Sequence, residues 1–275
     1  MMKIGNREFD FNNHTYVMGI LNVTPDSFSD GGNYCDVDCA VARAMEMVDE
    51  GADIIDIGAQ STRPGYVECG AEQEMQRIVP VLEKLRKTVS IPLSIDTYRA
   101  DVAEACLNIG ADIINDVSAL SDKGMARIVS DNDAVYVMMH GFGGEIAEDY
   151  DSADEYVARV IEEISSAVRR ATDAGIDSGR LIVDCGIGFG KSQKQNLMLL
   201  KHMDRLADMP YPVLLGASRK SVIGNVLELD VTQRLEGTIV TSALAVHNHI
   251  GIIRVHDVKE NVRAVKMAEA ISRSE

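Results

Sequence analysis

The sequence predicts a (β/α)8 barrel, formed by a single domain over residues 1–275, with a short N-terminal hairpin that caps the barrel bottom. Short runs rich in β-branched residues alternate with longer segments of 3.6-residue periodicity, and the alternation recurs eight times. The chain has 275 residues. A barrel of this kind typically needs roughly 250 residues. Fold class and length therefore agree.

The predicted strands are short and mostly apolar, as strands covered on both faces should be. They are Thr15 to Asn22, Asp53 to Ala59, Pro92 to Thr97, Ile113 to Val117, Ala134 to His140, Leu181 to Cys185, Val213 to Ser218 and Ile252 to His256. A doubly wound open sheet is the alternative architecture. Successive βα units without a long insertion fit closure into a barrel better.

The segments between the strands predict helices with one buried stripe. Two such stripes are Met75, Ile78, Val79, Leu82, Leu85 and Val157, Val160, Ile161, Ile164, Val168. A weak internal repeat, Gly51 to Asp56 and Gly110 to Asn115, ends a helix at glycine and opens a strand. Before the first strand, residues 3–14 predict a polar hairpin with its turn at Gly5-Asn6 or Asn12-Asn13.

Composition argues against several partners. The chain has 27 basic and 43 acidic residues, a net charge of −16, which would repel nucleic acid and anionic membrane surfaces. Neither an apolar leader nor a membrane-length apolar run occurs, so we expect a soluble, cytoplasmic protein. Five cysteines without a C-x-x-C pattern predict reduced thiols. A metal site at Cys35, Cys39 and Cys69 is the less favoured alternative.

Polar residues follow the predicted strands where the loops of a barrel converge on an active site. Carboxylates pair with N–H donors, while Asn and Lys donate to carbonyl oxygen or ring nitrogen, so one set could surround a flat nitrogen heterocycle. This set is Asp96, Asn115, Asp184 and Lys220. The set suited to phosphate oxygens is Ser61, Thr62, Arg63, Arg254 and His256. A single such Asp would more often be a helix cap or an ion pair. Their recurrence at equivalent strand ends predicts a phosphorylated heterocyclic ligand.

Three common motifs are not matched. Gly190-Lys191-Ser192 resembles the end of a P-loop, but Cys185 stands where that motif needs glycine. The run Gly186 to Gly190 does not have the G-x-G-x-x-G spacing. Ser218 lacks the second glycine of a nucleophile elbow, which argues against a serine hydrolase.

Seven segments together resemble the dihydropteroate synthase family. They occur in the family's order from about Val17 to Val258, as Gly19 to Gly32, Ser61 to Gly65, Ser94 to Thr97, Ile114 to Asp116, Gly186 to Lys191, Gly216 to Ser221 and Ile253 to Val258. The resemblance implies a (β/α)8 barrel, commonly a homodimer. It also implies a transferase of folate biosynthesis that condenses 6-hydroxymethyl-7,8-dihydropterin pyrophosphate with 4-aminobenzoate, with Mg²⁺ assisting. Sulfonamides mimic 4-aminobenzoate.

The resemblance also implies residue roles. Asp96, Asn115, Asp184 and Lys220 would hold the pterin, together with Met139 and Phe189; Arg254 would stack on the ring and reach phosphate with His256. Asn22 would help to coordinate Mg²⁺, and Ser218 would approach the carboxylate of 4-aminobenzoate. Residues expected in loops over pyrophosphate and 4-aminobenzoate are Phe28, Asp30, Ser61, Thr62, Arg63 and Pro64.

The expected reaction needs no protein nucleophile. Loss of pyrophosphate leaves a cation delocalised into the pterin ring, which a carboxylate such as Asp96 can stabilise. Mg²⁺ and cationic side chains stabilise the leaving charge, and the amine then adds. We expect Asp96, Lys220, Arg254 and Asp30 to be the catalytic residues.

The chain departs from the family pattern at three places. Gly58-Ala59-Gln60 replaces Gly-Gly-Glu, Cys185 replaces a proline, and the loop after His140 is short. The alternatives are a pterin-dependent methyltransferase, a lyase that uses Lys220 as a Schiff base, and a paralogue that binds pterin without turnover. Fold alone does not decide between these alternatives. The Ser-Thr-Arg-Pro-Gly and Ser-Arg-Lys segments argue against the methyltransferase, because the barrels of that class ordinarily lack them.

Overall fold

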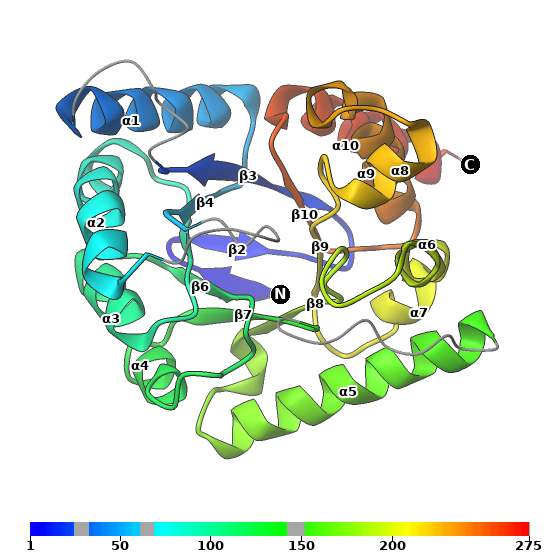
Figure 1. The fold of residues 1–275 in the computed structure, drawn as a ribbon, viewed down its shortest axis with the longest axis horizontal. Helices are drawn as coiled ribbons and strands as arrows, with labels where there is room; N and C mark the ends of the chain where they lie inside the picture. The colour runs from blue at the N-terminus through cyan, green and yellow to red at the C-terminus, as the bar shows by residue number, and fades with distance from the viewer. Residues whose placement is uncertain (25–32, 61–68, 142–151, 275) are drawn as a thin grey trace.

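The computed structural model describes residues 1–24, 33–60, 69–141 and 152–274, and its parallel strands close into a barrel (Figure 1). The strands are β3 (Tyr16–Asn22), β4 (Ile54–Gly58), β5 (Leu93–Asp96), β6 (Ile113–Asp116), β7 (Val135–Met139), β8 (Leu181–Asp184), β9 (Val213–Leu215) and β10 (Ile252–Val255). They follow chain order around the barrel, and β10 pairs with both β9 and β3. This closure confirms the predicted barrel and contradicts the open-sheet alternative.

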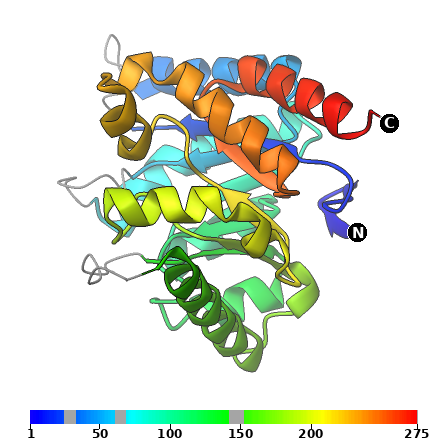
Figure 2. The same ribbon diagram turned by 90° about the vertical axis from the view of Figure 1, so that its right-hand side faces the viewer.

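Helices form the layer outside the barrel (Figures 1 and 2). They are α1 (Asn33–Glu50), α2 (Ala71–Thr88), α3 (Ala100–Ile109), α4 (Met125–Asp131), α5 (Ala153–Asp173), α6 (Gln193–Lys201), α7 (Met203–Ala207), α8 (Ser221–Leu227), α9 (Leu235–His247) and α10 (Val258–Ser272), with two short 3-10 turns, η2 (Ser178–Arg180) and η3 (Val231–Gln233). No helix in the described ranges combines the length and apolar character needed to cross a bilayer.

Most residues of the two predicted stripes are buried, whereas Met75, Val79 and Ile161 are only partly buried. Ile78, Leu82 and Leu85 of α2 are buried, as are Val157, Val160, Ile164 and Val168 of α5. Gly51 and Gly110 follow α1 and α3 with φ of +102° and +114°, a conformation that glycine adopts without a Cβ clash. The sequence repeat therefore corresponds to two equivalent helix-to-strand turns.

The N-terminal hairpin consists of β1 (Met2–Ile4) and β2 (Arg7–Phe9), which pair in antiparallel register. Its turn is at Gly5-Asn6, with a φ of +56° at Gly5. The expectation of a polar hairpin is only half right, because Met2, Ile4 and Phe9 are buried in the inner core cluster. Figure 2 shows the hairpin at the same end of the barrel as the C-terminus. This apolar face closes the bottom of the barrel interior.

The barrel interior changes character along the strands. Near the hairpin, buried inward-facing residues are apolar: Met18, Ile54, Ile113, Val137, Ile182, Leu214 and Ile252. Alternation along a strand brings residues two positions apart to the same face. Two residues beyond Ile54, Ile113, Ile182 and Ile252 stand Asp56, Asn115, Asp184 and Arg254. The lower interior is therefore a packed core, whereas the end formed by the strand C-termini is polar.

Candidate active site

Arg254 links two carboxylates within the polar end of the barrel. Its Nε donates to Oδ2 of Asp56 at 2.5 Å, and its Nη2 donates to Oδ2 of Asp96 at 2.6 Å. Asp56 is fully buried, and Asp96 and Arg254 are mostly buried. Burial alone would lower the pKa of Arg254, but Asp56 and Asp96 outweigh this and raise it. The guanidinium therefore carries a full positive charge into the site.

Asn115 joins the same cluster from β6. Its Nδ2 donates to Oδ2 of Asp56 at 3.1 Å, and both side chains are buried. Its strand neighbour in register is Asp96 on β5. The fold thus brings together three residues expected to bind pterin, Asp96, Asn115 and Arg254, around the unexpected Asp56.

Asp56 was absent from the sequence-based set because it lies within a strand rather than at its end. Two signals could have found it. It is the one charged residue in the apolar run Ile54 to Gly58, and the internal repeat aligns it with Asn115. A lone carboxylate among residues buried on both faces of a barrel strand has to point into the interior or be neutralised.

Asp96 has an unusual ionisation for a carboxyl group. Burial raises its pKa to about 7; Arg254 acts against this increase, and Asp56 adds to it. A carboxyl group with a pKa near neutrality changes charge in the range where an enzyme works, and such groups concentrate at functional sites.

Asp184 and Lys220 are a second pair of ionisable residues in the site. Asp184 is the last residue of β8, and Lys220 follows β9. Oδ1 of Asp184 accepts a hydrogen bond from the backbone N–H of Gly186 at 2.7 Å. Burial raises the pKa of Asp184, and Lys220 opposes this shift. Burial also lowers the pKa of Lys220 to about 8, although Asp184 favours its charged form. Burial therefore disfavours both charges, and each group's charge opposes that effect on the other.

Phe189 and Met139 border this pair. Nζ of Lys220 lies 4.5 Å from the ring centroid of Phe189 and donates to the carbonyl of Ile187. Met139 is buried and pairs in register with Asp184. The loop after β8 therefore presents an aromatic face beside an ammonium group, a surface suited to a flat ring.

Lys191 fixes the loops after β7 and β8 to each other. Its Nζ donates to the carbonyls of His140, Gly186 and Phe189 at 3.1, 3.0 and 2.9 Å. In the sequence, Lys191 belongs to a failed P-loop match and ends one of the seven segments that resemble the family. The structure shows that this lysine satisfies three backbone carbonyl acceptors.

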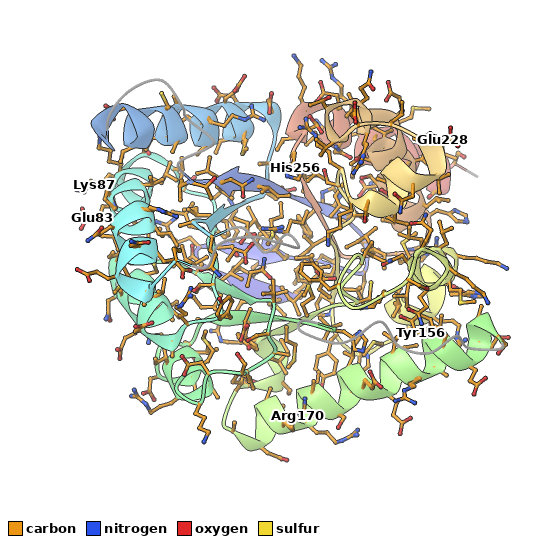
Figure 3. The ribbon with its side chains drawn as sticks, viewed as in Figure 1. Glu83, Lys87, Tyr156, Arg170, Glu228 and His256 are labelled. Atoms are coloured by element: carbon orange, nitrogen blue, oxygen red, sulfur yellow. The ribbon has the colours of Figure 1, made fainter. Side chains whose placement is uncertain are left out.

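Ser218 and His256 meet at the ends of β9 and β10. Oγ of Ser218 lies 3.0 Å from Nδ1 of His256 and accepts from the His256 backbone N–H at 3.2 Å. Figure 3 places His256 where the chain leaves β10 for α10. Arg219 next to Ser218 is held by Asp257. A hydroxyl and an imidazole are therefore adjacent at the mouth of the barrel.

The departure at Gln60 belongs to a buried polar network. Nε2 of Gln60 donates to the Tyr98 hydroxyl at 2.7 Å, and its Oε1 accepts from Nη1 of Arg99 at 2.9 Å. Arg99 also pairs with Glu74, which is buried on α2. A glutamine both donates and accepts here, which an ionised glutamate could not do.

Cys185, which replaces the family's usual proline, is buried in the main core cluster. Burial raises its pKa to about 12, so the thiol is neutral near pH 7. The side chain therefore packs as a small apolar residue.

Asn22 is exposed at the end of β3, in register with Gly58. The described residues contain no group of three or more His, Cys, Asp or Glu side chains that could hold a metal. Mg²⁺ commonly binds one or two protein oxygens and completes its shell with water and substrate phosphates. An exposed amide oxygen fits that pattern. Six expected site residues lie outside the described ranges: Phe28, Asp30, Ser61, Thr62, Arg63 and Pro64.

Known proteins similar to this chain bind pterins or make dihydropteroate. Residues 18–256 match the family described as pterin binding enzyme. The dihydropteroate synthase of Clostridium beijerinckii is 43% identical over 274 residues, covering 99% of this chain and 100% of that protein. The Escherichia coli K12 enzyme of the same name is 39% identical over 258 residues, covering 94% of this chain and 92% of that protein.

Solved structures show the same similarity. Dihydropteroate synthase from Clostridium difficile, crystallised with pteroic acid, superposes with a TM-score of 0.91 at 45% identity, covering 97% of this chain and 100% of that chain. The Xanthomonas albilineans enzyme with 4-aminobenzoic acid gives a TM-score of 0.89 at 41% identity, covering 96% and 95%. From its barrel, its polar strand ends and these relatives, the chain belongs to the pterin-binding enzyme family and, within it, to the dihydropteroate synthases.

Proposed function

We propose that this protein condenses 6-hydroxymethyl-7,8-dihydropterin pyrophosphate with 4-aminobenzoate, giving 7,8-dihydropteroate and pyrophosphate in folate biosynthesis. The observation that carries the proposal is the buried cluster of Asp96, Asn115 and Arg254 at the mouth of a barrel that belongs to this family. Asp184 and Lys220 supply the second half of the same pocket.

The pocket has the polarity that a pterin ring requires. The ring carries adjacent N–H donors and a carbonyl acceptor on a flat body. Asp184 and Asp96 offer carboxylate acceptors, while Asn115 and Lys220 offer donors. Arg254 and Phe189 offer planar or aromatic faces for stacking. This assignment places the ring across the polar end of the barrel interior.

The displacement proceeds through a pterin cation. As pyrophosphate leaves, positive charge spreads into the ring, and an ionised Asp96 stabilises it electrostatically. Because the carboxylates are already held by Arg254 and backbone donors, little reorganisation accompanies the charge change. The amine of 4-aminobenzoate then forms the new C–N bond and loses a proton.

Anionic groups of both substrates are assigned to the rim. Ser218 and His256 provide a hydroxyl and an imidazole at hydrogen-bonding distance from each other. By the family pattern, Ser61, Thr62, Arg63, Pro64 and Phe28 complete the sites for pyrophosphate and 4-aminobenzoate, and Asp30 assists catalysis. Asn22 would hold Mg²⁺ in part, and the bound metal would supply positive charge opposite the pyrophosphate.

We also assign the chain to the cytoplasm and to a homodimer. The cysteines that the structure describes are all free, as in a reducing compartment. The dimer is supported by exposed apolar side chains on adjacent elements: Val226, Leu227, Val231, Val240, Leu244, Met267 and Ile271. A structure of the Yersinia pestis enzyme holds a sulfonamide drug, and we extend that class of inhibitor to this chain.

A turnover assay tests the function. Purified protein is incubated with the pterin pyrophosphate, 4-aminobenzoate and Mg²⁺, and 7,8-dihydropteroate is detected by mass spectrometry. Product formation that stops when 4-aminobenzoate is omitted supports the proposal. Pterin binding without product would favour the non-catalytic paralogue, and methyl transfer from a pterin donor would favour the methyltransferase. Borohydride trapping of Lys220 would favour the lyase.

A further inference from the structure

Asp56 lies one inward-facing position deeper along the barrel wall than Asp96. In the register of β4 and β5, Gly58 stands opposite Asp96 and Asp56 stands opposite Ser94. Asp56 is fully buried. A carboxylate removed from water costs several kcal/mol or more unless it is paired, so its retention requires a partner.

The partners of Asp56 come from strands that do not adjoin β4. Around the barrel, β3 and β5 flank β4, whereas Arg254 belongs to β10 and Asn115 to β6. Both side chains nevertheless donate to the same oxygen, Oδ2 of Asp56, at 2.5 and 3.1 Å. The contacts therefore cross the interior and connect β10 and β6 to a single carboxylate oxygen on β4.

We propose that Asp56 is a positioning residue of the pterin pocket, which fixes the Arg254 guanidinium and the Asn115 amide by accepting a hydrogen bond from each. The inference rests on the proposed function only in that the ligand is a pterin. The charge of Arg254 is shared between Asp56 and Asp96, so Asp56 also limits how strongly Arg254 can stabilise the ionised form of Asp96.

The charged groups that act on Asp96 come from four elements: Arg254 of β10, Asp56 of β4, Glu74 of α2 and Asp116 of β6. Burial raises the pKa of Asp96 to about 7, Arg254 lowers it, and the three carboxylates raise it. Loss of the Asp56 charge must therefore lower the pKa of Asp96. Ionised Asp96 accepts the ring N–H groups, so pterin affinity in the unaltered protein should fall as the pH drops through about 7.

The test compares Asp56→Asn with the matched control Asp53→Asn. Asp53 immediately precedes β4, is partly buried, and accepts from the Val17 backbone N–H at 2.9 Å at the opposite end of the strand. Calorimetry with 6-hydroxymethylpterin measures affinity over the range from about pH 5 to 9. In D56N we expect affinity at high pH to fall about tenfold, and the pH midpoint to move down by about one unit. D53N should match the unaltered protein in both.

Each outcome of the D56N titration has one interpretation. A uniform loss of affinity in D56N without a shift in the midpoint would mean a purely structural role and would contradict the proposal. An unchanged affinity would do the same. If the folded, unaltered protein binds no pterin at any pH, the proposed function fails instead, and this inference fails with it.

A second measurement covers the case in which D56N does not fold. Carbon-13 NMR follows the carboxyl groups of the unaltered protein, with Asp96→Asn used to assign the Asp96 signal. We expect Asp96 to titrate near pH 7. A titration in the ordinary acidic range of an aspartate would contradict the pH dependence that the proposal predicts, because burial and the Asp56 charge would then not outweigh Arg254.

Discussion

Asp184 is the residue whose removal should damage pterin binding most directly. Its carboxylate is buried and accepts a hydrogen bond from the Gly186 backbone N–H, and the charge of Lys220 favours its ionised form. In Asp184→Ala, ring donors that the carboxylate would accept are left unpaired, and we expect a loss of about 1 to 3 kcal/mol or more in binding free energy. Calorimetry with a pterin measures this, with Asp177→Ala, at the cap of η2, as the control. An unchanged dissociation constant would remove Asp184 from the site.

At the same scale, Cys185 should matter for packing and not for chemistry. The side chain lies in the core cluster, and burial raises its pKa to about 12, so it supplies no thiolate. Cys185→Ala should cost about 1 kcal/mol of stability and leave turnover nearly unchanged. Urea unfolding and the turnover assay check this beside Cys39→Ala, an exposed cysteine. Lost turnover with intact melting and pterin affinity would contradict it.

Among the elements, the N-terminal hairpin should contribute stability and leave the site alone. The Phe9 ring is buried, with its centroid 4.5 Å from that of Tyr16 and 5.8 Å from that of Phe11. Phe9→Ala should reduce the unfolding free energy by about 3 to 5 kcal/mol. Pterin affinity of the folded protein should not change, because the hairpin lies at the opposite end of the barrel. Glu8→Ala, an exposed residue of β2, is the control.

One prediction for the segments that follow β3 and β4 comes from sequence alone. Arg63 is expected to hold pyrophosphate, whereas the pterin ring is assigned to other strands. Arg63→Ala should therefore reduce turnover strongly while leaving affinity for a pterin without phosphate nearly unchanged.

A further consequence is that 4-aminobenzoate, or a sulfonamide, should bind weakly to the free enzyme and much more tightly once pyrophosphate and Mg²⁺ are present. Titration of 4-aminobenzoate with and without both additions measures this. Equal affinities would show that the second site is preformed.

For the whole molecule, the apolar surface of α9 predicts association. Val240 and Leu244, one helical turn apart, are 57% and 45% exposed. A second copy of the chain would bury this stripe. We expect a dimer by light scattering, and a shift to monomer in Val240→Lys. Ala158→Lys on α5, the helix at the lower edge of Figure 1 and away from α9, should remain dimeric. A monomer in the unaltered protein would contradict the assignment.

Local patterns in the sequence determined the fold class and much of the pocket. Strand and helix periodicities depend on neighbours within a few residues, so they identified each βα unit. Because parallel strands in a barrel all end at one face, polar residues at those ends could be grouped before any contact was known. Asp96, Asn115 and Arg254 do lie together in the structure, and Asp184 lies with Lys220.

Tertiary structure alone decided how those groups are supported. The hydrogen bonds of Asp56 with Arg254 and Asn115 depend on barrel closure, because they join strands that are not neighbours. The same holds for Lys191 between two loops and for the apolar face of the hairpin. Sequence spacing reports which side chains share a strand or helix face, whereas contacts across the interior arise only when distant segments pack together.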